Sequence, residues 1–373
     1  MSEAYKIQCL VPDLPESENL LPFLQEMQQA KWYSNFGPLN SRFEDSMKSF
    51  IASLSGFDDF EVVTFTSATT ALEAALASLE LPKGANVLIP ALTFPATATA
   101  VINAGHTPVF SDVEEESWSL SPDIAAQMSK RKDFAAVMPV AVFGRPLDVA
   151  AWDAYAVSSG KKVVIDAAAA LGQQAAGRHV HMAFSLHATK PFSVGEGGLL
   201  VSPDAELAKR ARSWSNFGFL GPGGVISQVG TNAKMGEFYA AVGLAQLNRW
   251  EDVLAKRTAI MEAYLAGLKS LDNKITLQQG AEAFVPATLV VKTQGKALLL
   301  ADELAQVGVH TRFWYLPPLY EHPALAQYAI DQDPQNAFPV TEGLKHDLIG
   351  LPFHSFLTDD DVSFICETVA SYV

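Results

Sequence analysis

Residues 60–113 read FEVVTFTSATTALEAALASLELPKGANVLIPALTFPATATAVINAGHTPVFSDV, and this stretch decides the fold. Three short apolar runs in it predict strands, at residues 60–66, 86–90 and 107–113. The segments between them, 69–81 and 96–104, have the composition of helices. Strands that alternate with helices form mostly parallel sheets with helices on both faces, and such sheets bind ligands beyond the carboxyl ends of their strands.

The same alternation continues along the chain. Further strands are predicted at residues 135–140, 162–167 and 182–186. A long helical region at 235–271 leads into a different pattern of strand, helix and strand, at 286–292, 296–307 and 309–314, and a last helix begins with a capping box at Thr358. We therefore expect an α/β protein with a large domain at residues 1–250 and a smaller C-terminal α/β domain at 251–373.

Composition limits the class of protein. Of the 373 residues, 49% are hydrophobic and 18% are charged, as in a soluble globular protein. The formal net charge of -15 excludes nucleic acid and anionic membrane as expected partners. No apolar run reaches the roughly 18 residues of a membrane helix, and no leader sequence is recognised. Cys9 and Cys366 form no metal motif, so we expect reduced thiols in a cytoplasmic protein.

The segment FSLHATKPFSVGEGG, residues 184–198, places Lys190 beside the end of a predicted strand. Burial lowers the pKa of a lysine and frees its amine to attack a carbonyl, so Lys190 is a candidate for a Schiff base. Ser185 and Thr189 are close enough in sequence to bind a phosphate. The alternative interpretation of Lys190 is a solvated loop lysine.

Three other strand ends carry candidate groups. Asp166 ends the strand in VVIDAAAALG and suits a cation, a metal or a protonated ring nitrogen; alternatively it caps a helix. The turn TSATT, residues 66–70, opens a helix and suits a phosphate, or is only a capping box of Thr70 with Glu73. Phe94 is placed to cover a flat cofactor or to pack in the core. No third ligand accompanies His179 and His181, so no metal site is expected.

These features occur in one order that matches a known family. The matching segments are SNFGPLNSRFE (34–44), TSATTALEAAL (66–76), IPALTFPATATAVINAGHTPVFSDV (89–113), VVIDAAAALG (163–172), FSLHATKPFSVGEGG (184–198), GTNAKMGEFYAAVGLAQL (230–247) and YLPPLY (315–320). Through them the chain resembles the DegT/StrS family of nucleotide-sugar aminotransferases. Members of that family are pyridoxal 5′-phosphate (PLP) enzymes of fold type I.

The resemblance implies an activity and assigns roles to residues. An amino group would pass from an amino acid, glutamate, to the cofactor, giving pyridoxamine phosphate, and then to the keto carbon of a nucleotide-linked sugar. Lys190 would form the Schiff base and move protons, Asp166 would pair with the ring nitrogen, and Phe94 would stack on the ring.

The resemblance also assigns the contacts to the phosphate and to the sugar. The phosphate would be held by Ala68, Thr69 and Ser185, and by Asn232 of the other subunit of a homodimer. The sugar-side candidates are Asn35, Phe36, His187, Lys234, Arg312 and Tyr315. The implied pathway class is surface polysaccharide or secondary-metabolite assembly.

The chain departs from the family pattern at three positions. Ala169 stands where relatives have Gln or His, which bonds the phenolic oxygen of the cofactor. Ala68 replaces a common Gly, and Tyr320 replaces a His.

Two alternative functions remain beside the aminotransferase. One is a PLP-dependent sugar dehydratase or lyase, although dehydratase relatives have His in place of the lysine. The other is a non-catalytic PLP-binding sensor, which Ala169 alone favours.

Overall fold

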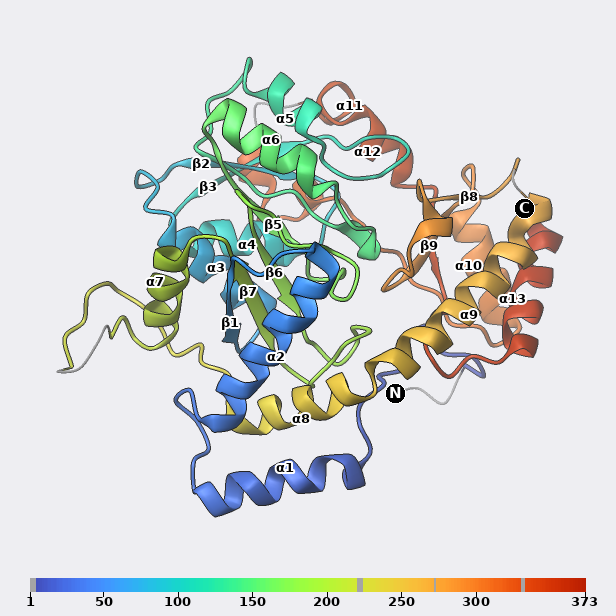
Figure 1. Cartoon of the computed structure of the whole chain (residues 1–373). Coiled ribbons are helices and arrows are strands. Elements are labelled where there is room, and N and C mark those ends of the chain that lie inside the picture. Colours follow the sequence, from blue (N-terminus) through green and yellow to red (C-terminus); the bar gives the residue numbers. More distant parts are fainter. Residues whose placement is uncertain (1–4, 220–223, 272, 330–332) are drawn as a thin grey trace.

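The computed structural model describes residues 5–219, 224–271, 273–329 and 333–373. These residues form two α/β units, one around a sheet of seven strands and one around a sheet of three (Figure 1). Within the described residues, every helix is too short or too polar to cross a membrane.

The larger sheet confirms the mostly parallel arrangement predicted from the sequence. Its strands are β1 (Glu61–Phe65), β2 (Asn86–Pro90), β3 (Thr107–Ser111), β4 (Ala136–Val137), β5 (Lys162–Asp166), β6 (His181–Ser185) and β7 (Gly198–Ser202). Their order is β1-β7-β6-β5-β4-β2-β3, and only the pairs that involve β7 are antiparallel. The carboxyl ends of β2, β4, β5 and β6 therefore meet along one edge of the sheet.

The strands are buried on both faces because apolar side chains point alternately to each side. In β5, Val163 and Ile165 pack in the core on one face and Val164 packs in the core on the other. The first face is covered by α2, α6 and α8, and the second by α3, α4 and α7. The carboxyl end of β5, with Asp166, is held between these two layers.

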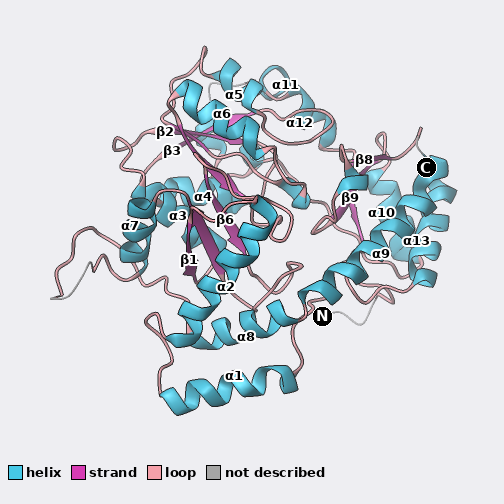
Figure 2. Cartoon of the chain, in the orientation of Figure 1, coloured by secondary structure: helices cyan, strands magenta, loops and turns pink. Residues whose placement is uncertain are grey.

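Figure 2 shows that helices surround both sheets. They are α1 (Ser17–Ala30), α2 (Pro38–Ser55), α3 (Ala68–Ser78), α4 (Pro95–Asn103), α5 (Pro122–Met128), α6 (Val149–Ser159), α7 (Ala205–Ser215), α8 (Glu237–Asn248), α9 (Trp250–Leu268), α10 (Ala297–Gln306), α11 (Pro334–Ala337), α12 (Pro339–Leu344) and α13 (Asp359–Tyr372). The capping box predicted for the last helix is confirmed, with Thr358 as N-cap and Asp361 three residues later.

The smaller unit has an antiparallel sheet in the order β10-β9-β8. Its strands are β8 (Thr276–Leu277), β9 (Leu289–Lys292) and β10 (Leu348–Leu351). Residues of α9, α10 and α13 pack with these strands in a separate core. Ile7 from the start of the chain bridges to Val309 and joins this core, so the N-terminal segment lies against the smaller unit.

α8 ends at Asn248 and α9 begins at Trp250, with Arg249 between them, and Trp250 and Val253 of α9 still pack in the core of the larger unit. The single helical region expected at 235–271 is therefore two helices. We propose Trp250 as the last residue of the large domain, giving domains of residues 1–250 and 251–373. Leu319 and Phe338, from the C-terminal part, pack in the core between the seven-stranded sheet and α3.

Several local predictions were wrong. Residues 309–314 do not form a strand, since only single bridges link Val309 to Ile7 and Arg312 to Gly350. The strand expected at 135–140 shortens to two residues. No helix follows Asp166, and α3 is capped by Ser67 with Thr70 rather than by Thr70 with Glu73. Small polar residues compete as caps within one turn, so sequence alone does not choose among them.

Candidate active site

A cavity of about 340 Å³ lies at the carboxyl end of the seven-stranded sheet and is closed on one side by the smaller unit. Asp166 and Ser185, the last residues of β5 and β6, open into it, and Phe94 follows β2. Thr288 and Tyr315 contribute from the C-terminal part of the chain. The volume is within the range of small-molecule sites, and the position is the one that a mostly parallel sheet favours.

Asp166 is buried, with 4% of its surface exposed, and its carboxylate is held from two sides. Thr97 donates its hydroxyl to Oδ2 at 2.7 Å, and the backbone N–H of Ala168 donates to Oδ1 at 3.1 Å. Burial raises the pKa of Asp166, while these two hydrogen bonds and the charge of Lys190 act in the opposite direction. A carboxylate has about four acceptor positions, so Asp166 retains capacity for a further donor in the cavity.

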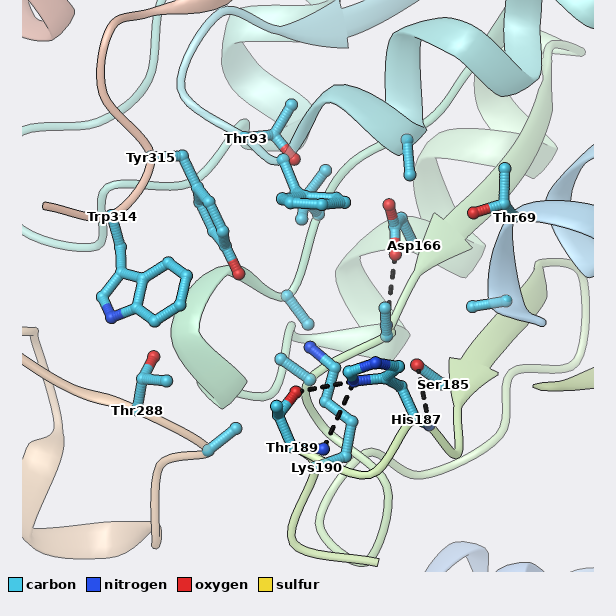
Figure 3. A pocket seen from close by; sticks show the side chains of 18 of the residues that line it. Thr69, Thr93, Asp166, Ser185, His187, Thr189, Lys190, Thr288, Trp314 and Tyr315 are labelled. Atoms are coloured by element: carbon cyan, nitrogen blue, oxygen red, sulfur yellow. Dashed lines mark hydrogen bonds between the residues drawn. The ribbon is translucent and has the colours of Figure 1, made fainter. Parts of the chain in front are cut away.

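Lys190 extends its side chain into the same cavity (Figure 3). No hydrogen bond or ion pair of its amine occurs within the part of the chain that the structure describes. Burial lowers the pKa of Lys190, and the charge of Asp166 partly opposes that effect. An amine with a lowered pKa and no partner is suited to attack a carbonyl.

The first turn of α3 forms another wall of the cavity. Its N-cap is Ser67, whose hydroxyl accepts from the N–H of Thr70 at 3.1 Å. The N–H groups of Ala68 and Thr69 have no acceptor inside the helix, because the first turn never does. β7 passes close beneath this turn, since a Cβ at Gly198 would lie 2.3 Å from the carbonyl carbon of Ser67. These N–H groups and the positive end of the helix dipole suit a phosphate.

The groups that line the cavity therefore fit a flat aldehyde that carries a phosphate and a ring nitrogen. Asp166 provides the acid for the nitrogen, Lys190 the amine for the aldehyde, and the first turn of α3 the phosphate cradle. Ser185 adds a hydroxyl, which accepts from the N–H of His187 at 3.2 Å. Phe94 borders the same space with 55% of its surface exposed.

The structure brings nine of the thirteen predicted site residues into this cavity. They are Ala68, Thr69, Phe94, Asp166, Ser185, His187, Lys190, Arg312 and Tyr315. The other four, Asn35, Phe36, Asn232 and Lys234, do not line it. Lys234 donates to Asn232 at 2.8 Å, and the Phe36 ring lies 5.0 Å from the guanidinium of Arg212. Tyr320 is buried against Phe338 and is also outside the cavity.

Four residues that the sequence did not predict line the cavity or support a residue that lines it. Thr97 holds Asp166, and Glu196 lies 3.6 Å from His187 across the cavity mouth. Thr288 and Trp314 line the side formed by the smaller unit. Thr97 lies in the first turn of α4, four residues after Thr93, with which it shares a hydrogen bond of 3.0 Å, and this spacing of two threonines is the signal that the sequence offers.

Comparison with known proteins shows one family across the whole chain. A model of the DegT/DnrJ/EryC1/StrS aminotransferase family matches residues 16–370. The dTDP-4-amino-4,6-dideoxy-D-glucose transaminase of Escherichia coli is 31% identical over 264 residues, which cover 69% of this chain and 68% of that protein. The match to the family includes both units and all the cavity residues except Leu10.

Two solved structures are similar over nearly their full length. DesI, crystallised in the presence of its TDP-sugar product, is 29% identical with a TM-score of 0.83, over 99% of this chain and 94% of that one. DesV of S. venezuelae, in complex with a ketimine intermediate, is 26% identical with a TM-score of 0.84, over 97% of this chain and 99% of that one.

Proposed function

The chain belongs to the DegT/DnrJ/EryC1/StrS aminotransferase family, and from this premise we propose that it moves an amino group from glutamate to the keto carbon of a nucleotide-linked sugar. It is an aminotransferase of the sugar-aminotransferase family, and its cofactor is pyridoxal 5′-phosphate. One observation carries the proposal: a buried carboxylate, Asp166, and an amine, Lys190, face one cavity beside a helix N-terminus.

The chemistry is divided between the cofactor and the chain. When bound, PLP supplies a sink for the electrons left behind when a proton leaves the carbon next to the amine. Asp166 keeps the proton on the ring nitrogen, and Thr97 and Ala168 fix the direction of its carboxylate. Lys190 carries the cofactor and then moves the proton between carbon atoms as general base and acid. Ala68, Thr69 and Ser185 hold the phosphate, and Phe94 covers the ring.

Relatives support the choice of substrate. DesI was crystallised with a TDP-sugar, and the Escherichia coli relative is named as a transaminase of a dTDP-linked sugar. In this chain the cavity wall opposite the phosphate turn carries Arg312 and Tyr315, and His187 stands at its rim. We assign Arg312 and His187 to the sugar nucleotide.

The buried free thiols Cys9 and Cys366 support a cytoplasmic reaction, within surface-polysaccharide or secondary-metabolite assembly.

The proposal is tested with purified holoenzyme, glutamate and a panel of nucleotide-linked 3-keto and 4-keto sugars. We expect one amino sugar and one 2-oxoglutarate per turnover. A sugar product that forms without glutamate would identify a dehydratase or lyase instead. A cofactor spectrum that glutamate leaves unchanged during long incubation would favour a binding protein without transfer activity.

We also propose that the enzyme is a homodimer with shared sites. Asn35, Phe36, Asn232 and Lys234 lie outside the cavity of their own chain, which is where residues that serve a partner's site would lie. Close by in the chain, several large side chains are exposed: Trp32, Tyr33, Phe217, Phe238 and Tyr239. The rings of Tyr33 and Phe238 stack at 6.3 Å, and contiguous exposed apolar groups mark interfaces.

Mixing two variants of low activity tests whether the two subunits share their active sites. Lys190→Ala and Asn232→Ala are each expected to lower activity, and a hybrid dimer of the two contains one site with both native residues if Asn232 acts across the interface. Activity of the mixture should then exceed that of either parent. A mixture no more active than its parents, or a monomeric mass in sedimentation of active holoenzyme, would contradict the shared site.

A further inference from the structure

Ala169 gives the phenolic oxygen of the cofactor no hydrogen-bond donor. It lines the cavity three residues after Asp166 and ends in a methyl group, which donates no hydrogen bond. The phenolic oxygen of PLP is a strong acceptor, and a buried acceptor without a donor destabilises the bound state. Another group in the cavity is therefore expected to serve this oxygen.

The covalent structure of PLP determines which wall the oxygen faces. The aldehyde lies between the phenolic oxygen and the phosphate arm on adjacent ring positions, and the ring nitrogen lies opposite the aldehyde. With the nitrogen at Asp166 and the aldehyde at Lys190, the phosphate and the phenolic oxygen lie on opposite sides of the line between these residues. Figure 3 shows Thr69 and Ser185 on one side of that line, and Tyr315 and Thr288 on the other.

Tyr315 is held in place by aromatic packing. Its ring stacks on Phe143 at 5.4 Å and meets the edge of Phe94 at 5.7 Å. The hydroxyl points into the cavity, and no hydrogen bond to it is found among the described residues (Figure 3). Burial, and secondly the charge of Asp166, raise the pKa of Tyr315, so the phenol keeps its proton and acts as a donor at neutral pH.

We propose that the hydroxyl of Tyr315 donates a hydrogen bond to the phenolic oxygen of PLP, which the methyl group of Ala169 cannot do. Tyr315 is then a cofactor-binding residue rather than a sugar contact. The inference rests on the proposed placement of the cofactor between Lys190 and Asp166. It also removes the reason to regard Ala169 as a mark of an inactive protein, because the donor is supplied from the smaller unit.

The pH dependence of the cofactor's visible absorbance tests the proposal. The band of the Lys190-linked cofactor changes when the linking nitrogen loses its proton, and the phenolic oxygen then carries an uncompensated negative charge. A donor to that oxygen stabilises the deprotonated form and lowers the pH at the midpoint of the absorbance change. Tyr315→Phe keeps the ring and removes the donor, so its midpoint is expected to rise by about one to two pH units, the range for a hydrogen bond to a charged group.

Thr288→Val is the matched control, because Thr288 is a further hydroxyl that the smaller unit brings to the cavity, and the variant is expected to leave the midpoint unchanged. Cofactor content and circular dichroism of each variant establish that it is folded and loaded. An unchanged midpoint in Tyr315→Phe overturns the proposal, as does a shift in Thr288→Val alone. A wild-type protein without a visible band would contradict the role of Lys190 itself, which separates that failure from a failure of Tyr315.

Discussion

Replacing Lys190 with alanine is expected to abolish covalent attachment of PLP and to reduce amino transfer by at least about 10³-fold. The variant loses the nucleophile that links the cofactor and also the general acid–base, and acid–base catalysis alone is worth about 10²- to 10⁴-fold. The measurements are the visible absorbance band of the purified protein and the initial rate of 2-oxoglutarate release. Borohydride reduction followed by mass spectrometry of peptides should find the cofactor on Lys190 in the wild type only.

Lys162 provides a matched control for this variant. It stands at the exposed opposite end of β5, in the same sheet, so Lys162→Ala removes a lysine of similar chemistry without touching the cavity. We expect its absorbance band and rate to remain as in the wild type. A Lys190→Ala protein that retains the band and more than about a tenth of the activity would show that another amine carries the cofactor, and would overturn the assignment of the site.

The parts of the fold that could be predicted are those with a local cause. β2, β5 and β6 are continuous apolar runs, and the structure has each of them within a residue or two of the predicted bounds. β7 was missed because Gly195 and Gly197 precede it and Gly198 begins it, and this glycine-rich composition is typical of a loop. The break at Arg249 was missed because α8 and α9 have one continuous helical composition, and only the backbone angles of Arg249 separate them.

The site shows the same division. Residues at strand ends, such as Asp166 and Ser185, were predicted because the topology of a parallel sheet brings these ends together. Thr97 was not predicted, since its role depends on a contact with Asp166, which is 69 positions later in the chain. Thr288 was not predicted either, since it reaches the cavity only because the smaller unit lies against the larger one. Tyr315 was predicted by resemblance, but its place beside Phe94 and Phe143 follows only from the tertiary structure.

Asp166→Asn is the second variant with a large expected effect, because it keeps the shape of the side chain and removes its charge. The amide no longer holds a proton on the ring nitrogen, so the carbanion formed during transfer loses its electron sink. Loss of one preorganised electrostatic partner of a transition state lowers kcat by about 10²- to 10³-fold, and we expect a fall of that size with KM for glutamate little changed. Thr97→Val removes one hydrogen bond to Asp166 and keeps the charge, so its rate should fall by about tenfold or less.

Asp166→Asn also changes the pH dependence of PLP uptake, and the direction of this change follows from the pKa of Lys190. The charge of Asp166 raises the pKa of Lys190 against the larger effect of burial, so removing that charge lowers the lysine pKa further. Only the unprotonated amine reacts with the aldehyde. The rate at which cofactor-free enzyme takes up PLP should therefore reach its plateau at lower pH in Asp166→Asn than in the wild type. A plateau that moves to higher pH, or a rate of transfer equal to that of the wild type, would show that Asp166 does not face the cofactor.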